Sequence, residues 1–238
     1  MIPDATVLDE IVSGNEGLFQ STGSIPRALI DMSTIDPTGS ARIGALLERS
    51  RVGYLRACVT GSTAYAENGT LGIMASGNYA LYQEVLPLLK VLGNRHSWLG
   101  TAEEARVCKI IINMLLGNLM QALAESLVLG EKNGLPWDTM IDLIADSAAA
   151  APIIKYKVDA LKARDFTAMA SAQMMEKDLN IALDIAKDSA VSLPETALTR
   201  QFYTAMRAEG LEGFDMSGLV LVSEMINGLR DPLQRKQE

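Results

Sequence analysis

Short apolar runs alternate with amphipathic stretches over the first hundred residues of the chain. Four of these runs have the length and flanking residues of buried strands, and they span 27–32, 53–61, 70–76 and 96–100. Apolar positions at helical spacing predict helices over 3–12, 38–51 and 78–93. Strands that alternate with helices in this way predict an α/β domain.

The pattern changes after Gly100, where the remainder of the chain reads as almost all helix. Helices separated by glycine and proline are predicted over 101–132, 136–148, 151–163, 170–191, 194–209 and 215–228. We therefore divide the chain into an α/β domain, 1–100, and an all-α domain, 101–238. The first helix of the second domain would be roughly 45–50 Å long and is apolar most of the way round. Such a helix must be surrounded, partly by its neighbours and partly by a second subunit, so we expect an oligomer.

Composition narrows the class of protein. The chain has 238 residues, of which 48% are hydrophobic, and a net charge of −8, which disfavours a nucleic-acid partner. Four polar residues interrupt the apolar run 110–130, so we expect no membrane span. The start has no signal-peptide pattern, and the two cysteines form no motif, which indicates reduced thiols in a cytoplasmic protein. A single histidine, His96, excludes a multi-histidine metal site, and we predict no metal.

Lys109 and Asn113 are the first candidates for chemistry. They stand four positions apart near the start of the long predicted helix, so they share a face of it. A lysine on an apolar face commonly extends its ammonium to water, and that is the ordinary interpretation. The functional interpretation is an ammonium in a partly dry cleft, where desolvation favours acid–base work on a carbonyl or hydroxyl oxygen.

The ends of two predicted strands supply further candidates. The second strand ends in Thr60, Gly61 and Ser62, and backbone N–H groups with two hydroxyls at that edge of a sheet suit a carboxylate. A plain connection between strands is the alternative. Ser33 and Thr34 follow the first strand and could equally cap the next helix.

Taken in order, five segments resemble the β-hydroxyacid dehydrogenase family, which includes 3-hydroxyisobutyrate dehydrogenase and the glyoxylate/succinic semialdehyde reductases. The segments are IDMSTIDP, VTGSTAYAENGTL, Lys109-x-x-x-Asn113, FTAMASAQMMEKDL and SLPETA. The resemblance runs from about residue 1 to 228. It implies a Rossmann-type sheet domain followed by a helical domain like the C-terminal domain of 6-phosphogluconate dehydrogenase, which holds substrate and makes the homodimer or homotetramer.

The resemblance also implies roles for individual residues. Lys109 matches the catalytic general acid/base and Asn113 the residue that assists it. The three residues Thr60, Gly61 and Ser62 match the loop that holds a small carboxylate substrate. Contacts to the cofactor, NAD or NADP, are implied for Pro3, Ser33, Thr34, Phe166 and Lys177. The function implied is hydride transfer between the nicotinamide and a small hydroxy acid or its semialdehyde. A lysine at position 109 disfavours the related imine reductases.

The sequence departs from the family pattern in two respects. It contains no G-x-G-x-x-G, and its opening MIPDATVLDE resembles an internal segment of the family, so we expect the N-terminal β-α units to be absent from this chain. Glu103 and Ala105 stand where the family usually has glycine. An alternative function is therefore a non-catalytic oligomerisation module that binds no dinucleotide.

Overall fold

The computed structural model describes residues 1–19 and 25–230. It divides into two compact units, Met1–Ile112 and Asn113–Glu238. The first contains α1 (Ala5–Ser13), β1 (Ala28–Asp31), α2 (Pro37–Arg49), β2 (Gly53–Thr60), α3 (Thr63–Glu67), β3 (Leu71–Gly77), α4 (Tyr79–Leu92) and β4 (Gly93–Gly100). One long helix, α5 (Glu104–Lys132), begins in the first unit and continues into the second.

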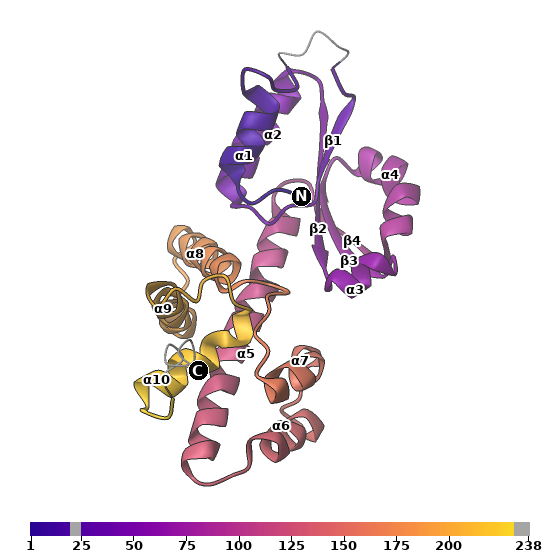
Figure 1. The fold of residues 1–238 in the computed structure, drawn as a ribbon. Coiled ribbons are helices and arrows are strands. Elements are labelled where there is room, and N and C mark those ends of the chain that lie inside the picture. Colours follow the sequence, from indigo (N-terminus) through magenta and orange to yellow (C-terminus); the bar gives the residue numbers. More distant parts are fainter. Residues whose placement is uncertain (20–24, 231–238) are drawn as a thin grey trace. The chain divides into compact units, whose positions relative to one another are not determined.

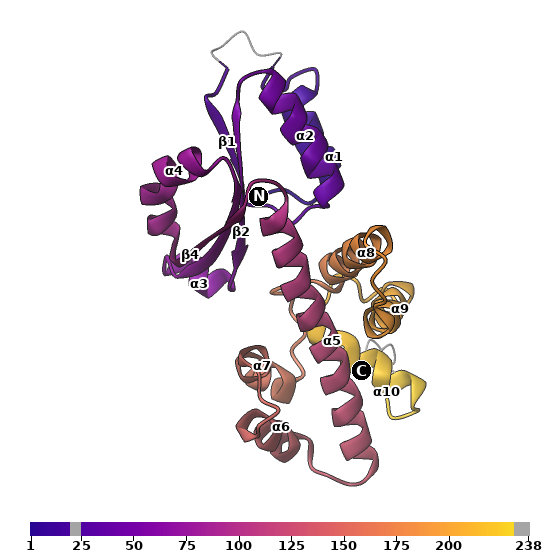
Figure 2. The ribbon, with the colours of Figure 1, turned by 180° about the vertical axis from the view of Figure 1, so that it is seen from behind.

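In the described part of the first unit, four strands form one mixed sheet in the order β1-β2-β3-β4. The pairs β1/β2 and β3/β4 are parallel, and β2/β3 is antiparallel. Each parallel connection crosses over through a helix, α2 or α4, as parallel pairing requires. Figure 1 and Figure 2 show α1 and α2 on one face of this sheet and α4 on the other.

Strand β2 has a core on each of its faces because successive side chains point to opposite sides of a sheet. Leu55 and Ala57 pack in a cluster with the α4 residue Leu89. Tyr54, on the other face, packs against α1 and α2. Cys58 lies on the Tyr54 face and contacts the cluster that contains Ala105, so the first turn of α5 covers that face beside α1 and α2.

The described part of the second unit is helical. It holds the rest of α5 with α6 (Trp137–Asp146), α7 (Pro152–Ala163), α8 (Ala172–Asp188), α9 (Pro194–Ala208), a short 3₁₀ turn η1 (Met216–Gly218) and α10 (Leu219–Ile226). Figure 1 shows α6 and α7 on one side of α5 and α8 and α9 on the other. Met120 and Leu127 of α5, Leu179 of α8 and Tyr203 of α9 meet in one buried core.

Among the described helices, α5 is the one long and apolar enough to cross a membrane, with a mean hydropathy of 1.6 over its most apolar window. The central helix of a folded core meets the same criterion, and Met120 and Leu127 give α5 that place. Leu115 and Leu129 on the same helix are exposed in the single chain. Whether a second subunit covers them, as the sequence led us to expect, stays a prediction.

The predicted fold class is confirmed, with one helix that was not predicted and shifts at the ends of several elements. A helical turn, α3, occupies a segment for which no element was predicted, because five residues are too few to show an apolar periodicity. Strand β4 begins at Gly93, three residues before the predicted strand, and α5 begins at Glu104 rather than at 101. Both segments have polar or small residues at the ends that were misplaced.

Candidate functional site

The turn after β2 combines a glycine that its packing requires with a buried hydroxyl that lacks a partner among the described residues. Gly61 has φ +127°, and a Cβ there would lie 2.9 Å from Cβ of Tyr65, so the position requires glycine. The Ser62 hydroxyl is buried, caps no backbone N–H and has no hydrogen-bond partner within the described residues. A buried hydroxyl without a partner costs free energy, which a ligand oxygen would recover. Thr60 beside it is half-buried.

Lys109 lies on the same face of the sheet as this turn. Thr60 and Cys58 are two residues apart in β2 and therefore point to one face. The first turns of α5 cover that face, and the charge of the Lys109 ammonium favours a lower pKa for the Cys58 thiol. Burial raises the pKa of Cys58 to about 11, against the opposing effect of the Arg106 and Lys109 charges. Lys109 itself is half-buried.

Asn113 follows one turn later on α5 and is buried. Its side-chain Nδ2 donates a hydrogen bond of 2.5 Å to Oδ2 of Asp178 on α8. That contact turns the Asn113 amide so that its oxygen is left as an acceptor. Lys177 lies 3.3 Å from the other carboxylate oxygen of Asp178 and keeps 31% of its side chain exposed.

Adjacent opposite charges near the start of a helix, such as Lys177 and Asp178, are ordinarily a solvated pair, but Asp178 is buried. Its residue is 4% exposed and its carboxylate binds a side chain 65 positions away in the sequence. Asp178 is a functional candidate that the sequence patterns did not reveal. The one signal in the sequence was an aspartate on the inward face of an amphipathic helix, because such a residue is rarely buried without a partner.

The segments of Pro3 and Thr34 lie side by side. The backbone N–H of Ile2 donates to the Ser33 hydroxyl at 2.9 Å, which joins the start of the chain to the loop after β1. Pro3 is exposed and Thr34 half-buried at this place. Ligands of open α/β sheets bind at the carboxyl ends of strands, and this is the carboxyl end of β1.

Two residues implied as cofactor contacts have interior positions instead. Ser33 is 1% exposed, and its amide, hydroxyl and carbonyl are all used inside the first unit, by Asp31, Ile2 and Arg106 respectively. Phe166 is 8% exposed and packs in the core of the second unit. Whether either residue contacts the cofactor stays a prediction.

A dinucleotide can be tested against these residues. The exposed Pro3 and the half-buried Thr34 at the end of β1 fit the nicotinamide end, and the unpartnered Ser62 hydroxyl fits a substrate beside it. The sequence holds no glycine-rich loop of the kind that binds a pyrophosphate. We therefore assign residues to the nicotinamide end alone.

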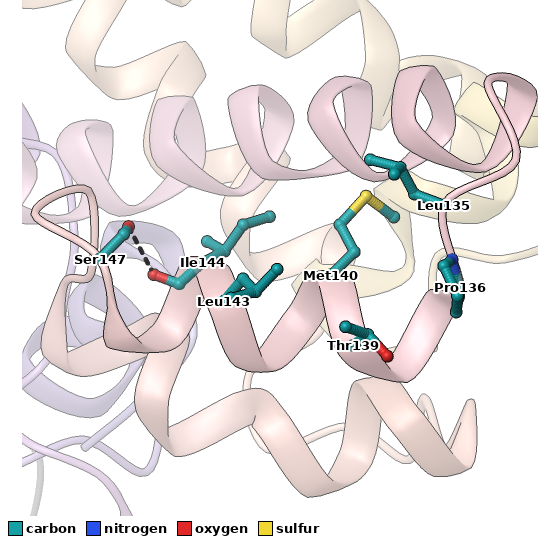
Figure 3. A pocket seen from close by; sticks show the side chains of 7 residues that line it. All are labelled: Leu135, Pro136, Thr139, Met140, Leu143, Ile144 and Ser147. Atoms are coloured by element: carbon teal, nitrogen blue, oxygen red, sulfur yellow. Dashed lines mark hydrogen bonds between the residues drawn. The ribbon is translucent and has the colours of Figure 1, made fainter.

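A hollow of about 280 Å³ beside α6 carries no such chemistry. Figure 3 shows its lining, which consists of Leu135, Pro136, Thr139, Met140, Leu143, Ile144 and Ser147. No lining side chain is titratable, so nothing there could move a proton. We therefore place the candidate active site at the β2 turn and Lys109.

Two protein-family models and several known proteins are similar to this chain. The family model described as the NAD-binding domain of 6-phosphogluconate dehydrogenase matches residues 1–100. A second family model, described as NAD-binding of NADP-dependent 3-hydroxyisobutyrate dehydrogenase, matches residues 104–223. The chain is 32% identical over 229 residues to 2-(hydroxymethyl)glutarate dehydrogenase of Eubacterium barkeri, covering 96% of this chain and 76% of that protein. It is 32% identical over 194 residues to glyoxylate/succinic semialdehyde reductase 1 of Arabidopsis thaliana, covering 82% and 67%.

The fold is also that of a solved relative. A crystal structure of 3-hydroxyisobutyrate dehydrogenase from Salmonella typhimurium superposes with a TM-score of 0.85 at 23% identity, covering 93% of this chain and 77% of that one. The chain belongs to the β-hydroxyacid dehydrogenase family. The predictions of an oxidoreductase of the 3-hydroxyisobutyrate dehydrogenase type, and of NAD or NADP as its cofactor, are confirmed.

Proposed function

We propose that the protein transfers a hydride between NAD or NADP and a small hydroxy acid or its semialdehyde, with Lys109 as general acid/base. The observation that carries this proposal is that the Lys109 ammonium and the Thr-Gly-Ser turn share one face of β2. A carboxylate held at the turn would bring the neighbouring carbon and its oxygen toward the same side of the sheet as the amine.

The substrate carboxylate binds at the β2 turn. Ser62 offers a hydroxyl without a partner, and Thr60 a second hydroxyl two residues before it in the sequence. Gly61 between them holds the turn at φ +127°, with Tyr65 and Leu71 packed where a Cβ would stand. Hydroxyl and N–H donors favour a carboxylate over a neutral group at such a turn.

Lys109 donates and accepts the proton of the reaction. The ammonium donates to the carbonyl oxygen when the semialdehyde is reduced, and the neutral amine accepts the hydroxyl proton in the reverse direction. Asn113, one helical turn away and oriented by Asp178, accepts a hydrogen bond from the amine or the substrate hydroxyl. Because Asn113 lies on the adjacent turn of the same helix, its distance from Lys109 is set by the helix.

NAD or NADP supplies the hydride acceptor or donor when it is bound. Pro3 and Thr34 would hold its nicotinamide end at the end of β1. The family resemblance implies a cofactor contact for Lys177 as well, and 31% of that side chain is exposed. Cofactor contacts are also implied for Ser33 and Phe166, which in addition stabilise the loop after β1 and the core of the second unit respectively.

The division of labour follows the two predicted domains. We assign the cofactor and the carboxylate-binding turn to 1–100, and the remainder of substrate binding, with oligomerisation, to 101–238. A homodimer or homotetramer would cover the exposed Leu115 and Leu129 of α5. Both cysteines are free thiols, which supports a reducing compartment such as the cytoplasm.

Turnover of matched aldehydes tests the proposal. Succinic semialdehyde and butanal have the same carbon chain and differ in the carboxylate. We expect NADPH or NADH oxidation with succinic semialdehyde or glyoxylate, and a kcat/KM lower by on the order of 10²-fold or more with butanal. Equal rates with butanal would contradict the carboxylate site, and oxidation with none of these aldehydes would contradict the reaction.

The second candidate is the oligomerisation module. One relative, 27% identical over 222 residues, is named cytokine-like nuclear factor N-PAC of Drosophila melanogaster, so not every relative is named as a dehydrogenase. Fluorescence titration with NADH and NADPH separates the two candidates. Micromolar binding favours the oxidoreductase, and no binding at millimolar nucleotide favours the module.

A further inference from the structure

The largest fully buried side chain among the described residues is an arginine, Arg106, in the first turn of α5. Its guanidinium makes four hydrogen bonds inside the first unit. Nε donates to Oγ of Ser40 at 2.6 Å, and Nη1 to the carbonyl of Ser33 at 2.8 Å. Nη2 donates to Oδ2 of Asp31 at 2.6 Å and to the hydroxyl of Tyr54 at 2.7 Å.

The charges around this arginine cancel. Glu103 pairs with Arg56 and lies 3.4 Å from Arg106 Nε, so two guanidiniums face the carboxylates of Asp31 and Glu103. Burial alone would raise the pKa of Asp31, but the Arg106 charge and the bonds from Ser33 hold it below its usual value. Asp31 is therefore ionised at neutral pH. Among the described residues Nε of Arg56 has no hydrogen-bond partner, whereas all three guanidinium nitrogens of Arg106 donate. A buried arginine with balanced charge and paired nitrogens is held rigidly and is costly to remove.

The network also explains the glutamate found where the family usually has glycine. The charge of Glu103 does not face a substrate unopposed, because Arg56 and Arg106 neutralise it. Arg56 in turn lies 4.1 Å over the ring of Tyr54. The departure from the family pattern is thus part of one self-contained cluster.

Arg106 connects two segments with proposed roles. It stands one helical turn before Lys109, and it binds the carbonyl of the residue that precedes Thr34. Its remaining bonds reach β1, β2 and α2. One guanidinium therefore fixes the first turn of α5 against the loop that carries Thr34.

We propose that Arg106 is a positioning residue, which sets Lys109 in register with the Thr34 loop although it touches neither substrate nor cofactor. The inference rests on the proposed function. Misplacing a reacting group by about an ångström lowers a rate on the order of 10²-fold, so the position of the amine is worth holding firmly.

Kinetics of Arg106→Met and Arg106→Lys test the proposal. We expect kcat to fall on the order of 10–10²-fold while KM changes less than about threefold, since substrate contacts are kept. Lysine cannot reproduce the fork of four bonds and should restore little. The double variant Asp31→Asn/Arg106→Met removes both charges of the pair, so no carboxylate is left buried without Arg106. It should fold, and its kcat should be as low as that of Arg106→Met.

Lys157→Met is the matched control. Lys157 forms a buried ion pair of 2.6 Å with Asp215 in the second unit, and its side chain is 4% exposed. Its loss should destabilise the protein while leaving kcat within about twofold of the parent. A kcat in the Arg106 variants as high as in Lys157→Met, or an equal loss in both, overturns the positioning role.

Thiol labelling gives a readout that needs no turnover. In a Cys108→Ser background, Cys58 is the one remaining thiol, and it is buried with its pKa raised to about 11. Its Sγ donates to the Ser33 carbonyl that Arg106 also binds. Arg106→Met should label with an aromatic disulfide at least about tenfold faster, and Lys157→Met should not. Unchanged labelling in Arg106→Met overturns the inference.

The two arms separate the inference from the function on which it rests. If the parent protein turns over no hydroxy acid or semialdehyde, the proposed function fails. The labelling rates still decide whether Arg106 holds α5 against the Thr34 loop.

Discussion

Asn113 donates a hydrogen bond to Asp178 across 65 positions of sequence, from the long central helix α5 to α8. Both residues are buried, and Asp178 has Lys177 as its second neighbour. The bond fixes which end of the Asn113 amide is a donor and which an acceptor. Because Asn113 lies one turn after Lys109, the orientation of this amide determines what the amine meets on that face of the helix.

Breaking the bond between Asn113 and Asp178 should lower kcat strongly and the free energy of unfolding modestly. Asp178→Ala leaves the buried Asn113 amide without its partner, which costs about 1–3 kcal/mol of unfolding free energy. The freed amide can rotate, so we also expect kcat to fall on the order of 10–10²-fold. Steady-state kinetics and urea unfolding measure the two effects.

Asn118 provides the comparison. It lies on the same helix and donates to the Thr196 hydroxyl at 3.1 Å, but it has no proposed role in the reaction. Asn118→Ala should be destabilised to a similar extent and keep the parent kcat. If the two variants lose turnover equally, Asn113 and Asp178 have only a structural role.

Gly61→Ala should weaken binding of the carboxylate. The new Cβ would lie 2.9 Å from Cβ of Tyr65 and 3.0 Å from Cδ2 of Leu71, at a φ of +127°. The turn must shift to relieve this contact, which displaces the Ser62 hydroxyl and raises KM for succinic semialdehyde about tenfold or more.

Gly134→Ala separates backbone strain from the site. Gly134 has φ +81°, and a Cβ there would meet nothing within 4 Å. We expect a loss of about 1 kcal/mol of stability and an unchanged KM. A KM unchanged in Gly61→Ala as well would remove the turn from the substrate site.

The buried pair Lys157–Asp215 should make the protein sensitive to acid. Burial tends to raise the pKa of Asp215, but bonds from Lys157 and Ser217 outweigh it and hold the pKa below its usual 3.8. A carboxylate with a lowered pKa stabilises the fold at higher pH, and that stabilisation is lost as pH falls through the folded-state value. Thermal unfolding should therefore show a Tm that drops between about pH 5 and about pH 2.

Asp215→Asn removes this titration. Its Tm should be lower near neutral pH, because Lys157 stays buried without a counter-ion, and should fall less steeply with acid. A parent and variant with parallel Tm–pH curves would show that Asp215 contributes no acid sensitivity.

Patterns in the sequence were sufficient for most elements and for few contacts. The apolar runs at β2 and β3 are bounded by turn residues and need no tertiary information. The helix α3 has only five residues, and its one large side chain, Tyr65, is exposed, so there is no apolar face that a pattern could reveal. Lys109 and the Thr60–Ser62 turn were identified through resemblance to a family, since each is unremarkable by composition.

Long-range polar pairs were out of reach for the same reason. Arg106 reads as a polar interruption at the start of an apolar helix, yet its partner Asp31 lies 75 positions earlier. Asp178 reads as half of a surface pair, because its bond to Asn113 depends on how α5 and α8 pack. The spacing of residues along one element carries no record of such partners.

Lys109→Ala with added small amines is the most direct test of the central claim. We expect kcat to fall on the order of 10²–10⁴-fold with succinic semialdehyde or another accepted substrate, because the proton source is gone. Methylamine should restore part of the rate in this variant and none in Lys155→Ala, which removes an exposed lysine of α7. A Lys109→Ala protein that turns over substrate at the parent rate would contradict the account.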